Sequence, residues 1–145
     1  MNPPLLPAIL CGALLAGCGA ETTPSGSSNT ADFPDEPLLA QASDGGQLTI
    51  ELRTSPSQPP ARGLSIVELS IADAQGDPMD DLVVTAVPWM PDMGHGTSVK
   101  PTVTNAGGGK YEIDNVNMFM PGRWDLRTEM TGPLDDSATF AFQIP

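Results

Sequence analysis

The fold class of this chain is decided by residues 123–130, which read Arg-Trp-Asp-Leu-Arg-Thr-Glu-Met. Trp124, Leu126 and Met130 fall on one parity, and charged residues occupy the other. Side chains alternate between the two faces of a β-strand, so this pattern predicts a strand with one buried and one solvated face.

The same alternation continues in both directions along the chain. Val99 and Val103 flank Pro101 and suggest an edge strand, because proline cannot donate to a sheet ladder. No segment has a sustained helical period, and glycine, proline and aspartate turns separate the runs. We therefore expect an all-β, antiparallel, immunoglobulin-like β-sandwich of about seven strands. The remaining expected strands are residues 48–53, 67–71, 82–87, 110–114 and 139–144.

The amino terminus has the organisation of an export signal. An apolar run from Leu5 to Leu15 is about 11 residues long, whereas a membrane-spanning helix needs about 20. The sequence Leu-Ala-Gly-Cys at 15–18 is similar to the lipobox of bacterial lipoproteins, in which the cysteine is acylated after cleavage in front of it. We expect residues 1–17 to be a lipoprotein signal peptide and Cys18 to carry the lipid; the alternative is an ordinary signal peptide with an incidental cysteine.

The segment that follows is small, polar, acidic and rich in proline, a composition that cannot bury enough surface to offset chain entropy. We predict a lipidated cysteine and flexible linker over residues 18–46, and a β-sandwich domain over 47–145. Within the linker, Leu38-Leu39-Ala40 is a short apolar patch that could dock on the domain. By analogy with Gram-negative lipoproteins, Gly19 favours the outer membrane, with the domain in the periplasm. The expected location is thus the cell envelope, with a lipid-anchored membrane contact.

Charge and composition argue against several functions. The net charge of −12 opposes nucleic-acid binding. The chain has one histidine and no phosphate-binding or nucleophile motif, so we expect no enzymatic activity. The acidic residues between Asp73 and Asp81 could bind Ca²⁺, although their spacing matches no known calcium loop.

Two methionine-rich segments stand out. Residues 88–96 contain two methionines and the only histidine, and residues 117–122 contain two more methionines. Thioether and imidazole ligands suit Cu(I). If Phe119 faces the core, its two methionine neighbours face away from it. The predicted copper ligands are Met93, His95, Met118 and Met120, with Met90 as a substitute and Trp89 as a cation–π lid. The alternative is that these methionines only pack.

The two segments resemble a known family. Met90-Pro-Asp-Met-Gly-His-Gly96, Gly109-Lys-Tyr111 and Met118-Phe-Met-Pro-Gly-Arg-Trp-Asp-Leu126 are similar to the YtkA-like domain, a relative of the FixH-like domain. The resemblance covers about residues 45–145. It implies a small β-sandwich of an exported or membrane-anchored bacterial protein, often found beside copper handling or cytochrome oxidase assembly.

Two functions follow as hypotheses. The first is a lipoprotein that binds Cu(I) and buffers it or passes it to a copper-handling or envelope protein. The second is a metal-free interaction module that contacts a protein partner through its methionine-rich loops.

Overall fold

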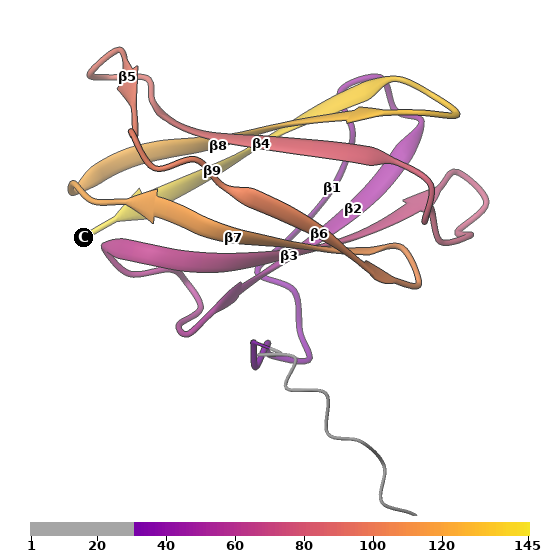
Figure 1. The fold of residues 1–145 in the computed structure, drawn as a ribbon, viewed down its shortest axis with the longest axis horizontal. Helices are drawn as coiled ribbons and strands as arrows, with labels where there is room; N and C mark the ends of the chain where they lie inside the picture. The colour runs from indigo at the N-terminus through magenta and orange to yellow at the C-terminus, as the bar shows by residue number, and fades with distance from the viewer. Residues whose placement is uncertain (1–30) are drawn as a thin grey trace, which may run out of the picture.

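A computed structural model describes residues 31–145 as two antiparallel sheets packed face to face (Figure 1). This confirms the predicted all-β sandwich. Within the described part, no helix is long and apolar enough to cross a membrane. The predicted signal peptide and Cys18 lie outside the described residues. The strands are β1 (Leu39–Ala42), β2 (Leu48–Ser55), β3 (Gly63–Asp73), β4 (Val83–Met90), β5 (His95–Gly96), β6 (Thr102–Gly107), β7 (Lys110–Met118), β8 (Gly122–Thr131) and β9 (Asp136–Ile144).

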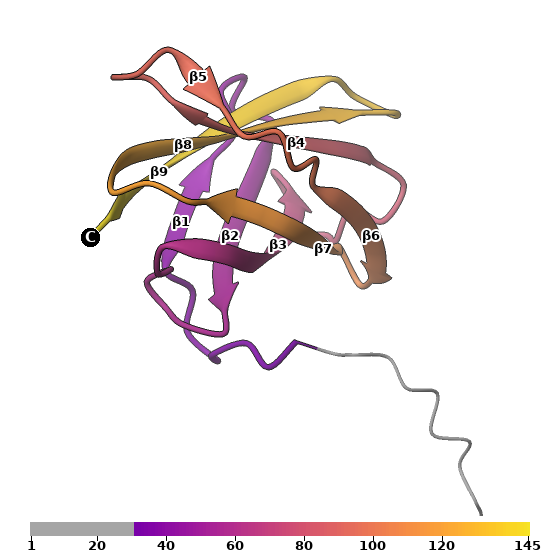
Figure 2. The same cartoon turned by 60° about the vertical axis from the view of Figure 1, so that its left-hand side comes forward.

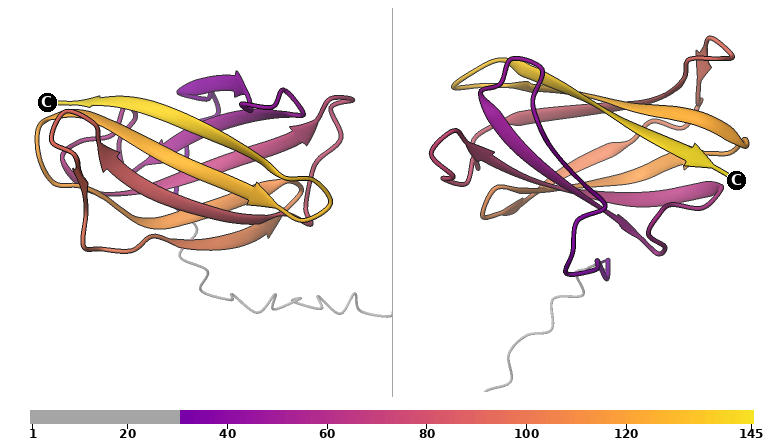
Figure 3. Two further views of the ribbon diagram at one scale, coloured as in Figure 1. Left: turned by 90° about the horizontal axis from the view of Figure 1, so that it is seen from above. Right: turned by 180° about the vertical axis from the view of Figure 1, so that it is seen from behind.

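Sheet A has the order β1-β2-β3-β7-β6, and sheet B has the order β5-β4-β8-β9. Seen from above, β4, β8 and β9 lie over the strands of sheet A (Figure 3). The edge strand expected around Pro101 is β6, which begins at Thr102 and forms one edge of sheet A.

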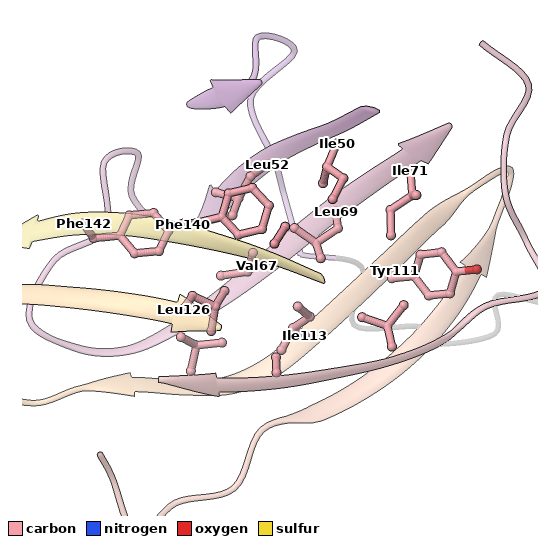
Figure 4. Packing of buried hydrophobic residues seen from close by; sticks show 14 of the residues in the cluster. Ile50, Leu52, Val67, Leu69, Ile71, Tyr111, Ile113, Leu126, Phe140 and Phe142 are labelled. Carbon is pink, nitrogen blue, oxygen red and sulfur yellow. The ribbon is translucent and has the colours of Figure 1, made fainter. Parts of the chain in front are cut away.

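The core is the layer between the sheets, and the alternation in the sequence identifies it correctly. Trp124, Leu126 and Met130 are all fully buried, as their parity predicts. Figure 4 shows Leu126 and Phe140 of sheet B pointing into the same layer as side chains of sheet A. Burial of this layer is the main stabilising contribution to the fold.

The sandwich has nine strands rather than seven. One addition, β1, lies inside the predicted linker and pairs with β2, with Leu39 opposite Leu52. The turn after it is fastened to sheet B, because Ser43 Oγ donates to Asp136 Oδ2 at 2.6 Å. The sandwich therefore begins at Leu39, eight residues before the predicted boundary at residue 47.

The part of the predicted linker that precedes β1 also contacts the domain. Arg53 Nη2 donates to the carbonyl oxygen of Asp35 at 3.0 Å, and Gln58 Nε2 donates to that of Glu36 at 2.8 Å. These backbone carbonyls, which any sequence supplies, explain why an acidic, proline-broken segment still lies against the domain. The segment 31–38 lies on the sheet A side of the molecule, away from β5 (Figures 1 and 2).

A β-bulge in β7 changes which of its residues face the core. Asn115 has a φ of +61°, and the register between β7 and β3 shifts at this point. Before the bulge Ile113 is buried, and after it Val116 and Met118 are buried. The bulge inserts one residue, so the inward parity changes from odd to even.

Candidate metal centre

The first half of the candidate site is the hairpin that joins β4 to β5. The turn is closed by Gly94, whose N–H donates to the carbonyl of Met90 at 2.9 Å and whose φ is +66°. Met90 and His95 are directly opposite each other in the register of the two strands. Cross-strand partners have their side chains on the same face of a sheet, so the thioether and the imidazole share one face.

The imidazole of His95 is held by the backbone. Its Nδ1 lies 2.9 Å from the carbonyl oxygen of Gly96. A carbonyl oxygen only accepts, so Nδ1 carries the hydrogen in this contact and a neutral ring keeps a lone pair on Nε2. Histidines that bind metals commonly donate their other ring N–H to a backbone carbonyl in this way.

The second half of the site is the turn between β7 and β8. Met118 is only 1% exposed, and Met120 is partly buried and packs on the core, whereas Phe119 is 44% exposed. The condition considered from the sequence, that Phe119 faces the core and its methionine neighbours face away, is therefore not met. The cause is the bulge at Asn115, which reverses the parity of the strand that leads into this turn.

The two halves meet through aromatic contacts. The ring of Phe119 stacks on that of His95 with a centroid distance of 6.2 Å and an interplanar angle of 21°. Phe119 also packs edge-on against Trp124 at 5.7 Å, and Trp124 Nε1 donates to the carbonyl of Met120 at 2.9 Å. The β7–β8 turn is thus fixed both to the histidine and to the core.

Met90 reaches the same turn from sheet B. Its Cε lies only 3.2 Å from the position that a Cβ on Gly122 would occupy. Gly122 also has a φ of +126°, a backbone conformation that other residues rarely adopt. A glycine at this position therefore leaves room for the end of the Met90 side chain.

Two predicted residues take no part in the contacts described above. Met93 sits in the β4–β5 turn and is 56% exposed. Trp89 follows the opposite parity from Met90, and the guanidinium carbon of Arg127 lies 5.0 Å from the centroid of its ring. The cation–π interaction that the structure gives Trp89 is with Arg127, and the ring is not brought over the methionines.

The donors gathered at this end of the sandwich are soft. Between residues 31 and 145, no group of three or more histidine, cysteine, aspartate or glutamate side chains is placed to hold a metal. In the acidic loop considered for calcium, Asp73 Oδ1 instead accepts the backbone N–H groups of Gln75 and Asp77, each at 2.9 Å. Thioether and imidazole groups, which are what Met90, Met118, Met120 and His95 carry, are donors of the kind that suits Cu(I).

Sequence reasoning missed Phe119 and Gly122 as parts of this site. The contact between Phe119 and His95 depends on the parity change in β7. The pair Asp114-Asn115 inside a strand pattern was the available signal, because asparagine is enriched at positive φ.

Comparisons with known proteins identify the family. The chain is similar in structure to a DUF4426 family protein from Pseudomonas aeruginosa PAO1, with 11% sequence identity, 72% of this chain and 92% of that chain covered, and a TM-score of 0.48. No curated protein matches the sequence. A family model described as YtkA-like matches residues 42–129, which include the β4–β5 hairpin and the β7–β8 turn. The chain belongs to the YtkA-like family.

Proposed function

We propose that this protein is an exported lipoprotein, anchored in a membrane through Cys18, that binds copper as Cu(I) and buffers it or passes it on. The observations that support the proposal are the register of His95 opposite Met90 and the stacking of His95 on Phe119, which lies between Met118 and Met120 in the chain. The hydrogen bond from Nδ1 to the carbonyl of Gly96 leaves Nε2 available as a ligand. Thioethers also stay usable in an oxidising compartment, where thiols form disulfides.

The ligand set that the structure favours differs in one member from the predicted set. Met90 is directly opposite His95 in the register, whereas Met93 is exposed in the turn. We therefore assign Met90, His95, Met118 and Met120 as the ligands. We assign Met93 a separate role, as an exposed side chain that binds copper before it reaches these ligands. Met90 and Met118 are 3% and 1% exposed, so copper binding requires the β7–β8 turn to shift.

The proposed membrane anchor is compatible with access to this site. The segment 31–38 lies on the sheet A side, and β5 lies on the other side of the sandwich (Figures 1 and 2). A chain that approaches from the sheet A side leaves the methionine end open to partners in the envelope.

The test is a competition for Cu(I) between the protein and a chromogenic chelator. We compare the wild type with His95→Ala and with the double variant Met118→Leu/Met120→Leu, which nearly conserves volume. Each change should weaken the copper affinity by about tenfold or more, the scale on which even indirect changes around metal ligands act. Met130→Leu is the matched control, because Met130 is as buried as Met118 but lies in β8 near the other end of the core.

The pH dependence adds a second readout. An imidazole must be neutral to bind a metal, so the wild-type affinity should fall in acid. The affinity of His95→Ala should change little with pH, because thioethers do not titrate. Equal affinity in the wild type and all variants would contradict the proposed ligands.

The exposed tip of the site favours a second candidate function. Met93 and Phe119 are 56% and 44% exposed at the same end of the molecule, and adaptable methionine surfaces serve in protein binding. In this alternative the loops contact a protein partner without metal. This alternative would be favoured if neither the wild type nor any variant competed with the chelator for Cu(I).

A further inference from the structure

Strand β4 has an edge that is largely unpaired. In sheet B it lies between β8 and β5, but β5 pairs only with Trp89 and Met90. Along Val83–Pro88, no strand of the described chain occupies the side opposite β8. An unpaired edge of this kind is a template for pairing with another chain.

The direction of the β4 peptide groups can be read from two contacts. The carbonyl of Met90 accepts the N–H of Gly94 on the β5 side. The carbonyl oxygen of Pro88 lies 2.7 Å from the position that a Cβ on Gly96 would occupy, so it also points to that side. In an antiparallel strand the N–H and C=O of one residue point to the same side, and that side is the same for every second residue. The N–H and C=O groups of Val84 and Ala86 therefore point to the open edge, like the carbonyls of Pro88 and Met90. No described segment outside the sheet pairs with them.

A groove runs beside this edge. It has a volume of about 590 Å³ and lies between β4 and the segment 97–103, which crosses from β5 in sheet B to β6 in sheet A (Figure 2). Its lining is mainly apolar, and this volume is in the range of ligand-binding clefts. The apolar lining residues are Val84, Ala86, Val87, Pro88, Val99, Pro101 and Val103.

One cation borders the groove. Lys100 is among its lining residues and is exposed. It takes part in none of the four ion pairs found among residues 31–145, although the whole chain carries a net charge of −12. The groove therefore presents an uncompensated positive charge beside apolar side chains and free backbone groups.

We propose that the open edge of β4 binds an extended peptide segment of a partner protein, which adds to sheet B as a strand in line with β5. The free N–H and C=O groups of Val84 and Ala86 require a polypeptide backbone as their complement. The apolar groove accepts the peptide's alternate side chains, and Lys100 selects a carboxylate near them. This site is separate from the copper ligands and does not depend on copper binding.

The test uses the full-length chain and peptides selected against it from a displayed library of random hexapeptides. The selected peptides should alternate apolar residues and carry an acidic residue or a terminal carboxylate. N-methylation of the peptide amides that face β4 should weaken binding by roughly twofold to tenfold for each hydrogen bond removed. Lys100→Glu should weaken binding by about twofold or more, while Lys110→Glu, which alters sheet A, should not.

Amide hydrogen exchange locates the peptide. On addition of a selected peptide, the amides of Val84 and Ala86 should become protected, whereas those of Thr85 and Val87, which face β8, should change little. The proposal is overturned if no peptide is selected, if N-methylation has no effect, or if protection appears elsewhere. It is also overturned if Val84 and Ala86 become protected without peptide as protein concentration rises and sedimentation shows a dimer, because a second copy then fills the edge.

Discussion

Replacement of Trp124 by alanine should destabilise the fold more than a change at most other single positions. Its side chain is fully buried, packs against Phe119 and donates a hydrogen bond to the carbonyl of Met120. Truncation of a buried aromatic costs about 3–5 kcal/mol. A domain of this size has a total stability of about 5–15 kcal/mol, so the variant should retain only a fraction of it.

The measurement is unfolding in urea, followed by circular dichroism, with thermal melts in parallel. A loss of 3 kcal/mol in a domain of about 100 residues lowers Tm by roughly 12 °C or more. Trp124→Phe keeps an aromatic ring but removes the N–H donor, and should cost about 1–2 kcal/mol. The control is Arg127→Ala on the outer face of the same strand, which loses only the contact with Trp89 and should cost about 0.5–1 kcal/mol. Equal losses for Trp124→Ala and Arg127→Ala would refute the assigned inward parity of β8.

Three further predictions concern other parts of the chain. Cys18→Ser should abolish acylation, and mass spectrometry that finds an unmodified Cys18 in the wild type would contradict the lipid anchor. Burial tends to raise the pKa of Asp136, but hydrogen bonds from Ser43 Oγ and from backbone N–H groups lower it overall, so the stability it adds is present above about pH 4 and is lost as the pH falls further. Urea unfolding from pH 6 to pH 3 should therefore show a smaller loss for Asp136→Asn than for the wild type. Gly122→Ala should cost about 1–3 kcal/mol in the same assay, because its φ is unfavourable for alanine and its Cβ would press on Met90; an unchanged midpoint would contradict this.

The parts of the fold that follow from local alternation could be predicted from sequence. The inward residues Trp124, Leu126 and Met130 of β8 were identified because they share one parity and charged residues occupy the other. Strand β1 was missed because its few apolar residues lie in an acidic, proline-rich stretch. It pairs with the next strand, β2, and the turn after it is held by the distant Asp136, a contact that a local pattern does not record.

The candidate site was predicted in composition but not in arrangement. The clustering of methionines around His95 is visible in the sequence, whereas their orientation depends on the bulge at Asn115. One inserted residue turned Met118 inward and Phe119 outward. The backbone contact that orients His95 is also a tertiary feature, set by the hairpin geometry of β4 and β5.

The most direct test of the proposed copper site is nuclear magnetic resonance during titration with Cu(I), which is diamagnetic. With ¹⁵N-labelled histidine and ¹³C-labelled methionine methyl groups, we expect the Nε2 signal of His95 to shift on metal binding while Nδ1 keeps its hydrogen. The methyl signals of Met90, Met118 and Met120 should shift with the same stoichiometry, and that of Met130 should stay in place. Unchanged His95 and Met118 signals in the presence of excess Cu(I) would contradict the assignment of this end of the sandwich as a copper site.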